Sequence, residues 1–416
     1  MPASHPTASP MRIAVFTDTF LPQINGVVTS ILQFAEELGR RGHAVLIVTP
    51  KPRRKPATPY HAPGVSVVHV PSLPALVYPD FRLGMLGLKT TVEHMQAFDP
   101  DILHFHTPLP VGRYAVQAAK LMRKPLVGTN HIYLTKNNDS FLDFLSEAMP
   151  MRKSLSAFIM RYNKTFYDAC DLRLVPSRRL IGELLAEGYA TPMEYLPNGI
   201  QVDGIVQLND VKRSDMKKKL GLKEKVVLHF GRISKEKNVD EVLRAFAQVR
   251  AKRKDVSLLL IGGGPALKSL QSLAKELDIA KDVVFTGPIP HRKLLAEGYL
   301  SLGDVFVTAS RMENHSMVLL EAMAAGQPVV CYRDAGLEEV AEGCGLLVPA
   351  ADVAALAEGI DAVLADPKRG EKMTEGSLRR AQEFSVTHLT DRLLELYEGV
   401  RTRKQIPREV MIPVEG

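Results

Sequence analysis

Short apolar runs alternate with segments of helical periodicity along almost the whole chain, and this alternation constrains the fold more than any other feature. The run "MRIAVFTD" (11–18) reads as a buried parallel strand, with the strand itself predicted at 12–17. After the turn "LPQING", apolar residues recur at helical spacing until Gly42, and "HAVLIVTP" (43–50) follows as a second strand. A strand, a helix and a strand in this order form a βαβ unit, which builds parallel sheets.

The alternation occurs twice, before and after a Lys-rich stretch at 212–225. The further strands predicted in the first half are 65–70, 101–106, 125–130 and 172–177. Those predicted in the second half are 226–231, 256–264, 282–287, 304–310, 328–332 and 345–349, with helices at 238–252, 265–277, 316–325 and 352–364. Because 416 residues exceed what one hydrophobic core normally serves, we predict an α/β protein with two Rossmann-like domains that face each other across a deep cleft.

The predicted domains are a disordered N-terminus at 1–10, an N-terminal Rossmann-like domain at 11–208, a C-terminal Rossmann-like domain at 209–383, and a C-terminal helix and tail at 384–416. The linker is expected near 200–215. In the tail, one helical face carries Leu389, Leu393, Leu396, Tyr397 and Val400. An apolar stripe of this kind is buried in globular proteins, so we expect the helix to pack back on the N-terminal domain.

The charge distribution favours small anionic ligands or lipid surfaces over nucleic acid. The net charge is +7, and residues 1–208 contain 21 Lys and Arg against 16 Asp and Glu, so most of the excess lies in the first half. Aromatic residues make up 6% of the chain and tryptophan is absent. Dedicated nucleic-acid binders usually show a dense basic stripe with interleaved aromatics, so no nucleic-acid partner is expected.

Cysteine usage and hydropathy indicate a cytoplasmic protein. The three cysteines include no C-x-x-C pair, which gives neither a disulfide framework nor zinc spacing and favours a reducing compartment. The N-terminus "MPASHPTASP" lacks the features of a secretory leader, and nowhere do 18 apolar residues run together. The chain can still lie on the inner face of a membrane as a peripheral protein.

Two glutamates flank a predicted anion site in the second half. In "SRMENHSMVLLEAMAAGQPVV" a strand ends at Ser310, and a helix starts near Ser316 and stops at Gly326. Free N–H groups and the helix dipole suit such a start to a phosphate, with Glu313 beside it and Glu321 about a turn and a half further on. The alternative is that both are ordinary solvated charges. Context favours a site, because Arg232 and Lys237 leave another strand end and can clamp phosphates.

Six stretches, in this order, carry a family resemblance: "FTDTFLPQINGVVTSI", "LPNGI", "GRISKEKN", "IGGGP", "FTGPI" and "ASRMENHSMVLLEAMAAGQPVV". Together they resemble the retaining glycosyltransferases of the GT-B fold, in the family 4-like group that includes glycolipid glucosyl- and mannosyltransferases. The resemblance spans roughly residues 11–400. It implies an N-terminal acceptor domain and a C-terminal domain that binds a nucleotide-sugar donor.

The resemblance also assigns roles to residues of the C-terminal domain. It implies that Arg232 and Lys237 bind the donor diphosphate, that Glu313 binds the sugar hydroxyls, and that Glu321 binds the ribose. The segment at Pro288 and Ile289 lies where the family holds the base. The remaining donor residues, which include backbone N–H groups at the helix start, would be Asn314, His315, Ser316, Met317 and Val318. The family usually has an aromatic residue or Gln and then Gly after the first glutamate, whereas this chain has "ENHS".

In the N-terminal domain the resemblance places Gly26 in the loop that closes over the diphosphate and His131 at the active site near the anomeric centre. Candidate acceptor contacts are Asp18, His106 and Tyr133. His104 and His106 alternate on one strand face, and we expect them to line the cleft floor rather than hold a metal. The "DPD" motif at 99–101 precedes a strand with a turn-forming proline, so it is interpreted as a loop.

The sequence therefore predicts transfer of a hexose from a nucleoside-diphosphate sugar such as UDP-glucose or GDP-mannose. The resemblance implies retention of configuration and a lipid acceptor such as diacylglycerol or a phospholipid headgroup, with an anionic membrane surface as partner. Transfer to a soluble polyol, phosphosugar or glycan is an alternative, as is a nucleotide-sugar epimerase or a binding module without turnover. No metal or other cofactor is expected, because Arg232, Lys237 and the helix dipole can stabilise the leaving diphosphate.

Overall fold

The computed structural model describes residues 9–23, 25–53, 60–74, 82–85, 87–131, 161–311 and 313–405. The chain divides into two compact units. Unit 1 comprises Met1–Gly199 and Val386–Gly416, and unit 2 comprises Ile200–Ser385. The predicted linker near 200–215 overlaps α7 (Asp210–Lys219), a helix of unit 2. Two side chains of this helix, those of Arg213 and Lys217, hold it to the unit, since they bind Asp304 at 3.0 and 3.1 Å.

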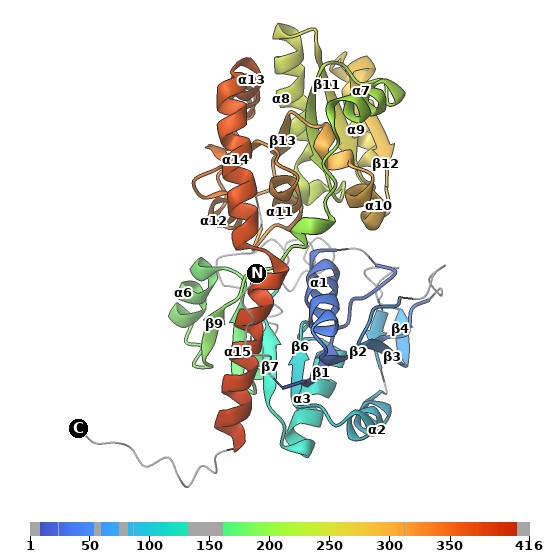
Figure 1. Ribbon diagram of the computed structural model, residues 1–416, viewed down its shortest axis with the longest axis vertical. Coiled ribbons are helices and arrows are strands. Elements are labelled where there is room, and N and C mark those ends of the chain that lie inside the picture. The colour runs from blue at the N-terminus through green and yellow to red at the C-terminus, as the bar shows by residue number, and fades with distance from the viewer. Residues whose placement is uncertain are drawn as a thin grey trace, which may run out of the picture. The chain divides into compact units, whose positions relative to one another are not determined.

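Unit 1 is built on a parallel sheet in the order β3-β2-β1-β6-β7-β8-β9 across the described residues (Figure 1). Its strands are β1 (Arg12–Phe16), β2 (Ala44–Pro50), β3 (Val65–Val70), β6 (Ile102–Phe105), β7 (Leu126–Thr129), β8 (Leu172–Val175) and β9 (Met193–Tyr195). A separate antiparallel pair consists of β4 (Ser72–Pro74) and β5 (Arg82–Gly84). The helices with described bounds are α1 (Gly26–Arg40), α2 (Leu88–Phe98), α3 (Pro110–Met122), α6 (Arg178–Ala186) and α15 (Val386–Gln405).

Both faces of the central strands of this sheet are buried, which explains why these strands are largely apolar runs. In β1, Ile13 and Val15 belong to one hydrophobic cluster, while Ala14 and Phe16 belong to a cluster on the other face. Successive side chains of a strand point to opposite faces, so a strand covered on both sides is mainly apolar, and its few polar side chains, such as those of His104 and Arg173, are buried with hydrogen-bond partners. Every predicted strand of the first half is confirmed in this sheet.

Unit 2 has a second parallel sheet, in the order β12-β11-β10-β13-β14-β15. Its strands are β10 (Lys225–Phe230), β11 (Val256–Ile261), β12 (Val283–Gly287), β13 (Val305–Thr308), β14 (Val329–Tyr332) and β15 (Leu346–Val348). Its helices are α7 (Asp210–Lys219), α8 (Val239–Lys252), α9 (Leu267–Glu276), α10 (His291–Ala296), α11 (Met317–Ala324), α12 (Ala335–Ala341), α13 (Val353–Ala365) and α14 (Pro367–Glu383). The two parallel-sheet units confirm the predicted α/β class with two Rossmann-like domains.

The C-terminal helix α15 packs on unit 1, as predicted. Leu389, Leu393 and Tyr397 join the hydrophobic cluster that includes residues of α1, beside which α15 lies in Figure 1. Arg41, at the end of α1, bonds to the Asp391 carboxylate and the Thr387 carbonyl oxygen. A Cβ added at Gly199 would lie 2.9 Å from the Val386 Cα atom, so only glycine allows the chain to pass the start of α15 so closely.

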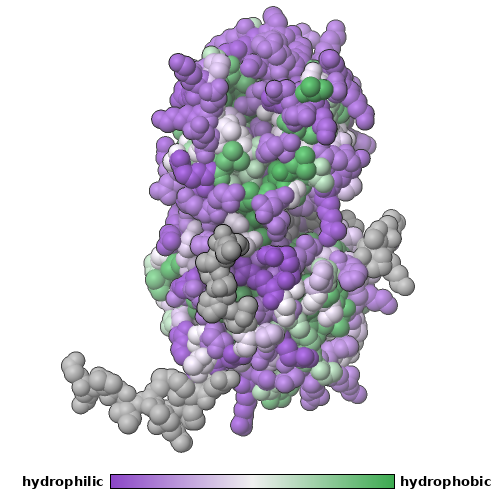
Figure 2. Space-filling model, viewed as in Figure 1, coloured by the Kyte–Doolittle hydropathy of each residue, from purple (hydrophilic) through white to green (hydrophobic). Residues whose placement is uncertain are grey.

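The face drawn in Figure 2 is largely hydrophilic, with small separate groups of hydrophobic residues. The most exposed large hydrophobic side chains are those of Leu121 and Val211. Within the described parts of the chain, no helix combines the length and the apolar character needed to cross a membrane.

Candidate active site

In unit 2 the loop after β10 carries the predicted phosphate ligands. Arg232 is exposed directly beyond this strand, and Lys237 ends a short 3-10 helix at Lys235–Lys237. Asn238 follows in the left-handed conformation (φ 49°), and its side-chain amide donates to the Ala309 carbonyl oxygen at 3.1 Å. Asn tolerates this conformation better than most residues, and its bond ties the loop to the end of β13.

The glycines of "IGGGP" shape this loop. A Cβ at Gly262 would lie 1.9 Å from the Gly231 carbonyl oxygen, and one at Gly264 would lie 2.1 Å from the Ile233 carbonyl oxygen. Both glycines also have positive φ angles, of 144° and 157°. The motif is therefore needed for the close packing of two strand-end loops, one of which carries Arg232.

Lys237 and Glu313 meet although they are far apart in the sequence. The Lys237 Nζ atom lies 2.6 Å from the Glu313 Oε1 atom, and the two side chains are only 30% and 16% exposed. A charge-assisted hydrogen bond in this setting orients both groups. The structure thus brings together a predicted phosphate ligand and a predicted sugar ligand within unit 2.

Asp334, a residue that the sequence did not single out, holds the Glu313 loop in place. Its Oδ1 atom accepts from the N–H groups of Glu313 (3.4 Å), Gly336 (3.1 Å) and Leu337 (3.3 Å), and it is the N-cap of α12. Burial raises the pKa of Asp334 above its usual value, against the effect of these hydrogen bonds. An Asp directly before a helix start in "YRDAGL" is the signal that could have identified this cap.

The helix start predicted near Ser316 is confirmed. Ser316 is the N-cap of α11, and its hydroxyl oxygen accepts from the Leu319 N–H group at 3.4 Å. Asn314 and Val318 are half-buried, whereas Met317 is buried. His315 was expected as a possible sugar contact, but its ring is 5% exposed and lies edge-on to Phe384, with centroids 5.1 Å apart. Burial lowers the pKa of His315 to about 3, so the ring is neutral at physiological pH.

Glu321 lies on α11, as predicted, and it is paired with a residue that the sequence did not single out. Its Oε1 atom lies 2.7 Å from Nε2 of His291, the first residue of α10. Burial works against protonation of His291, but the hydrogen bond and the charge of Glu321 outweigh it and raise the His291 pKa. Ile289, the predicted base contact, is half-buried two positions before His291.

In unit 1 the predicted catalytic His131 follows β7 and bonds to His106. The His106 Nδ1 atom lies 2.8 Å from His131 Nε2, and the two rings are stacked with centroids 5.1 Å apart. Burial lowers the pKa of His131 to about 4 and that of His106 well below its usual value. Both rings are therefore neutral near pH 7, and one of the two bonded nitrogen atoms carries the shared proton.

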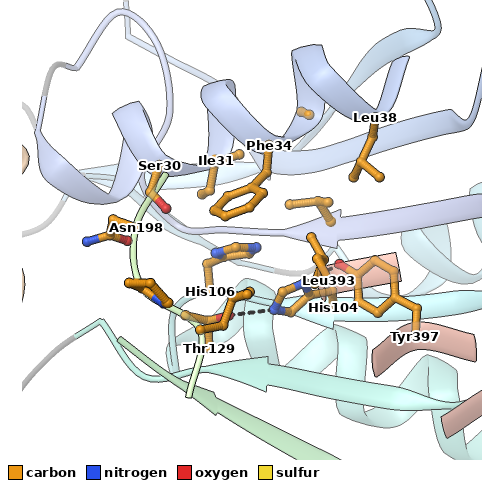
Figure 3. Close-up of a pocket in the computed structure, with 14 residues that line it drawn as sticks. Ser30, Ile31, Phe34, Leu38, His104, His106, Thr129, Asn198, Leu393 and Tyr397 are labelled. Carbon is orange, nitrogen blue, oxygen red and sulfur yellow. Dashed lines mark hydrogen bonds between the residues drawn. The ribbon is translucent and has the colours of Figure 1, made fainter. Parts of the chain in front are cut away.

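His104 and His106, expected at the cleft floor, line a small cavity inside unit 1. Figure 3 shows side chains of α1 on one side of this cavity and the two histidines with Thr129 on the other. The cavity offers about 20 Å³ to the centre of a water-sized sphere, which is room for one water molecule. His104 bonds to Thr129 (2.6 Å) and Tyr397 (2.7 Å), so it ties β6 to β7 and to α15.

The remaining predicted residues of unit 1 have different surroundings. Asp18 is buried, and its carboxylate accepts from the Thr107 hydroxyl (2.9 Å) and the Val111 N–H group (3.1 Å), which joins β1 to the start of α3. Gly26 is exposed and is the first residue of α1. Tyr133 lies outside the described residues. The "DPD" loop is confirmed, since Asp101 accepts from the Arg12 N–H group (2.8 Å) directly before β6.

A buried arginine bonded to Asn130 is a further feature that the sequence did not reveal. The Arg173 guanidinium is stacked between Tyr167 (3.9 Å to the ring centroid) and Tyr189 (4.4 Å). Its Nη2 atom donates to the Asn130 side-chain oxygen at 2.7 Å, and Asn130 directly precedes His131. Within the described residues no group of three His, Cys, Asp or Glu side chains is arranged to hold a metal ion.

Comparison with known proteins places this arrangement in a family. Residues 24–203 match the model of Glycosyltransferase Family 4, and residues 211–380 match that of Glycosyl transferases group 1. The chain is 32% identical over 330 residues to the alpha-monoglucosyldiacylglycerol synthase of Streptococcus pneumoniae, an alignment that covers 77% of this chain and 71% of that protein.

Two further comparisons agree with this placement. The chain is 28% identical over 397 residues to a GDP-mannose-dependent alpha-mannosyltransferase of Corynebacterium glutamicum, which covers 94% of this chain and 89% of that protein. Among solved structures, Anabaena HepE in complex with UDP has the same fold, with a TM-score of 0.72 at 19% identity over 94% of this chain and 100% of that chain. The chain therefore belongs to the GT-B glycosyltransferases of the group 1 and family 4 type.

Proposed function

We propose that the protein is a retaining hexosyltransferase that uses a nucleoside-diphosphate sugar, such as UDP-glucose or GDP-mannose, and a lipid hydroxyl acceptor. The observation that carries this proposal is the 2.6 Å contact between Lys237 and Glu313 beside the start of α11. The relative in Streptococcus pneumoniae is named for a glucosyldiacylglycerol product, which supports diacylglycerol or a phospholipid headgroup as the acceptor here.

The donor diphosphate and the hexose would bind side by side in unit 2. A Lys ammonium group has three N–H donors, and one of them goes to Glu313, so two are left for phosphate oxygens. Arg232 adds a second cation, and the N–H groups at the start of α11 add a positive dipole end. These groups would stabilise the charge that develops on the leaving diphosphate, which is where an enzyme of this kind gains most of its rate.

In unit 1, His131 would act on the sugar as a neutral hydrogen-bonding group. Its pKa of about 4 means that it carries no charge near pH 7, and His106 occupies its Nε2 atom. In front-face attack the leaving phosphate oxygen takes the proton of the acceptor hydroxyl, so no protein base is required. The described residues then have the tasks of binding, orienting and stabilising charge.

The test is a matrix of donors and acceptors. Purified protein is incubated with UDP-glucose, UDP-galactose or GDP-mannose, each with diacylglycerol vesicles, phosphatidylinositol vesicles, glycerol or no acceptor, and products are identified by mass spectrometry and NMR. We expect an α-linked glycolipid from one donor. Product only with glycerol would support a soluble acceptor, and free sugar without any acceptor would support an epimerase or hydrolase.

We also propose reversible binding of the protein to anionic membranes. Arg53, Arg54, Lys55, Arg152 and Lys153 are cations of the more basic half of the sequence. Of these five residues, Arg53 is the one that the structure describes, and it follows β2. Each cation near an anionic surface contributes about 1 kcal/mol, and salt screens this attraction.

Co-sedimentation with anionic and neutral vesicles at low and high salt tests this proposal. The compared proteins are the wild type and one variant with five substitutions to Ser, at Arg53, Arg54, Lys55, Arg152 and Lys153. We expect salt-sensitive binding of the wild type to anionic vesicles and weaker binding of the variant. Equal partitioning of the two proteins would contradict the proposal.

A further inference from the structure

His291 and Glu321 form a pair that neither the family motifs nor the proposed chemistry explains. His291 is the first residue of α10 and Glu321 lies in the middle of α11, and both belong to unit 2. The His291 Nε2 atom lies 2.7 Å from Glu321 Oε1. The Glu321 side chain is only 5% exposed, whereas that of His291 is 27% exposed.

The bond uses only one side of the carboxylate. An ionised carboxylate has two oxygen atoms with about four acceptor positions in total. His291 occupies one position on Oε1, and among the described residues no hydrogen-bond donor reaches Oε2. Oε2 is not among the buried polar atoms that lack a partner, so it is accessible to solvent or to a ligand that donates a hydrogen bond. The two hydroxyls of a ribose provide such donors.

The position of His291 connects two predicted nucleoside contacts. It directly follows Pro288, Ile289 and Pro290, the segment predicted to hold the base. Glu321 is the residue predicted to bind the ribose. A change in the position of the base segment would therefore be transmitted to Glu321 through a single hydrogen bond.

We propose that His291 is a positioning residue for the nucleoside: it fixes the Glu321 carboxylate so that Oε2 accepts from the ribose diol of the donor. This inference rests on the proposed function. The charge of Glu321 favours the protonated form of His291, which agrees with a strong bond that holds the carboxylate in one orientation.

The alternative is that the pair only joins α10 to α11. Such a bond would contribute to stability, but its loss would not distinguish ribose from deoxyribose. If His291 positions Glu321, its loss should weaken the binding of nucleotides that have ribose hydroxyls and leave the binding of dideoxy nucleotides unchanged. The two possibilities can therefore be separated by changing the ligand and the protein together.

The experiment measures, by calorimetry, the dissociation constants of UDP and GDP and of their 2′,3′-dideoxy analogues. The proteins are the wild type, His291→Ala, His291→Gln, His291→Asn and the control Lys293→Ala, which changes an exposed cation on the same helix. The amide nitrogen of Gln can reach the position of Nε2, whereas that of Asn reaches only the position of Nδ1.

We expect His291→Ala to weaken binding of the preferred ribonucleotide by about tenfold, the scale of one hydrogen bond to a charged group. The affinity of His291→Ala for the dideoxy analogue should equal that of the wild type. His291→Gln should bind the ribonucleotide nearly as well as the wild type, whereas His291→Asn should bind it as weakly as His291→Ala. The control Lys293→Ala should bind it like the wild type. Equal weakening for both sugars, or none, would overturn the inference alone. If the wild type bound neither UDP nor GDP, the proposed function would be overturned as well.

Discussion

Gly336→Ala is expected to disable the donor site through a steric contact. A Cβ atom at Gly336 would lie 1.9 Å from the Glu313 carbonyl oxygen, 2.5 Å from its carbonyl carbon and 2.9 Å from that of Asn314. Real Cβ atoms essentially never approach closer than 3.0 Å. The Glu313 backbone must therefore move by roughly 1 Å (3.0 against 1.9 Å), a displacement that can lower an enzymatic rate by about 10²-fold.

The assay is kcat/KM for the nucleotide sugar, measured by release of the nucleoside diphosphate. We expect a decrease of about 10²-fold for Gly336→Ala, since Glu313 would no longer meet Lys237 at hydrogen-bond distance. Gly370→Ala is the matched control, because its Cβ would have the Val363 carbonyl oxygen, at 4.0 Å, as its nearest neighbour. Circular dichroism establishes that both variants are folded. Wild-type kinetics for folded Gly336→Ala would refute the argument that this loop is held rigidly.

Three further predictions concern unit 1 and the chemistry. His106→Phe should lower kcat by about tenfold, the scale of one hydrogen bond, while His106→Asn, whose amide lies near the position of Nδ1, should retain most of the rate. Burial raises the pKa of Asp18 from 3.8 to about 7, so the folded state holds this proton more tightly and wild-type stability should fall as pH rises from 4 to 7. Thermal melts of Asp18→Asn should lack that fall, and an identical pH profile would count against it. Transfer should persist in excess EDTA, because Arg232 and Lys237 supply the positive charge, and rescue only by Mg²⁺ or Mn²⁺ would disprove this.

The strands and the main helices could be predicted because the spacing of their apolar residues depends on which of their faces are buried. In β10, Val226, Leu228 and Phe230 face one hydrophobic cluster while Val227 faces the other, so the sequence pattern records both contacts. The pair β4 and β5 was missed, since each strand has three residues and includes polar ones such as Ser72 and Arg82. A strand of three residues is too short to leave a periodic signal.

The candidate site could be predicted as a set of residues but not as a set of contacts. Lys237 and Glu313 are 76 positions apart, and His291 and Glu321 are 30 apart, so their pairing depends on how β10, β12 and β13 lie in one sheet. The burial of His315 against Phe384 could not be predicted either, because the sequence around a histidine in a loop does not indicate how its ring packs. Sequence motifs predict which residues bind the nucleotide sugar, whereas the structure reveals the side chains, such as His291 and Asp334, that contact these residues.

The most direct test of the account is the turnover of Glu313→Ala and Lys237→Ala at saturating donor and acceptor. Both residues are half-buried and bonded to each other at 2.6 Å, and each would touch the sugar or the diphosphate in the transition state. We expect that each variant stays folded and loses about 10²-fold or more in kcat, the scale for one preorganised polar contact. Lys235→Ala, an exposed lysine of the same 3-10 helix, should retain wild-type turnover. Near-normal turnover by either Glu313→Ala or Lys237→Ala would contradict the placement of the donor site in unit 2.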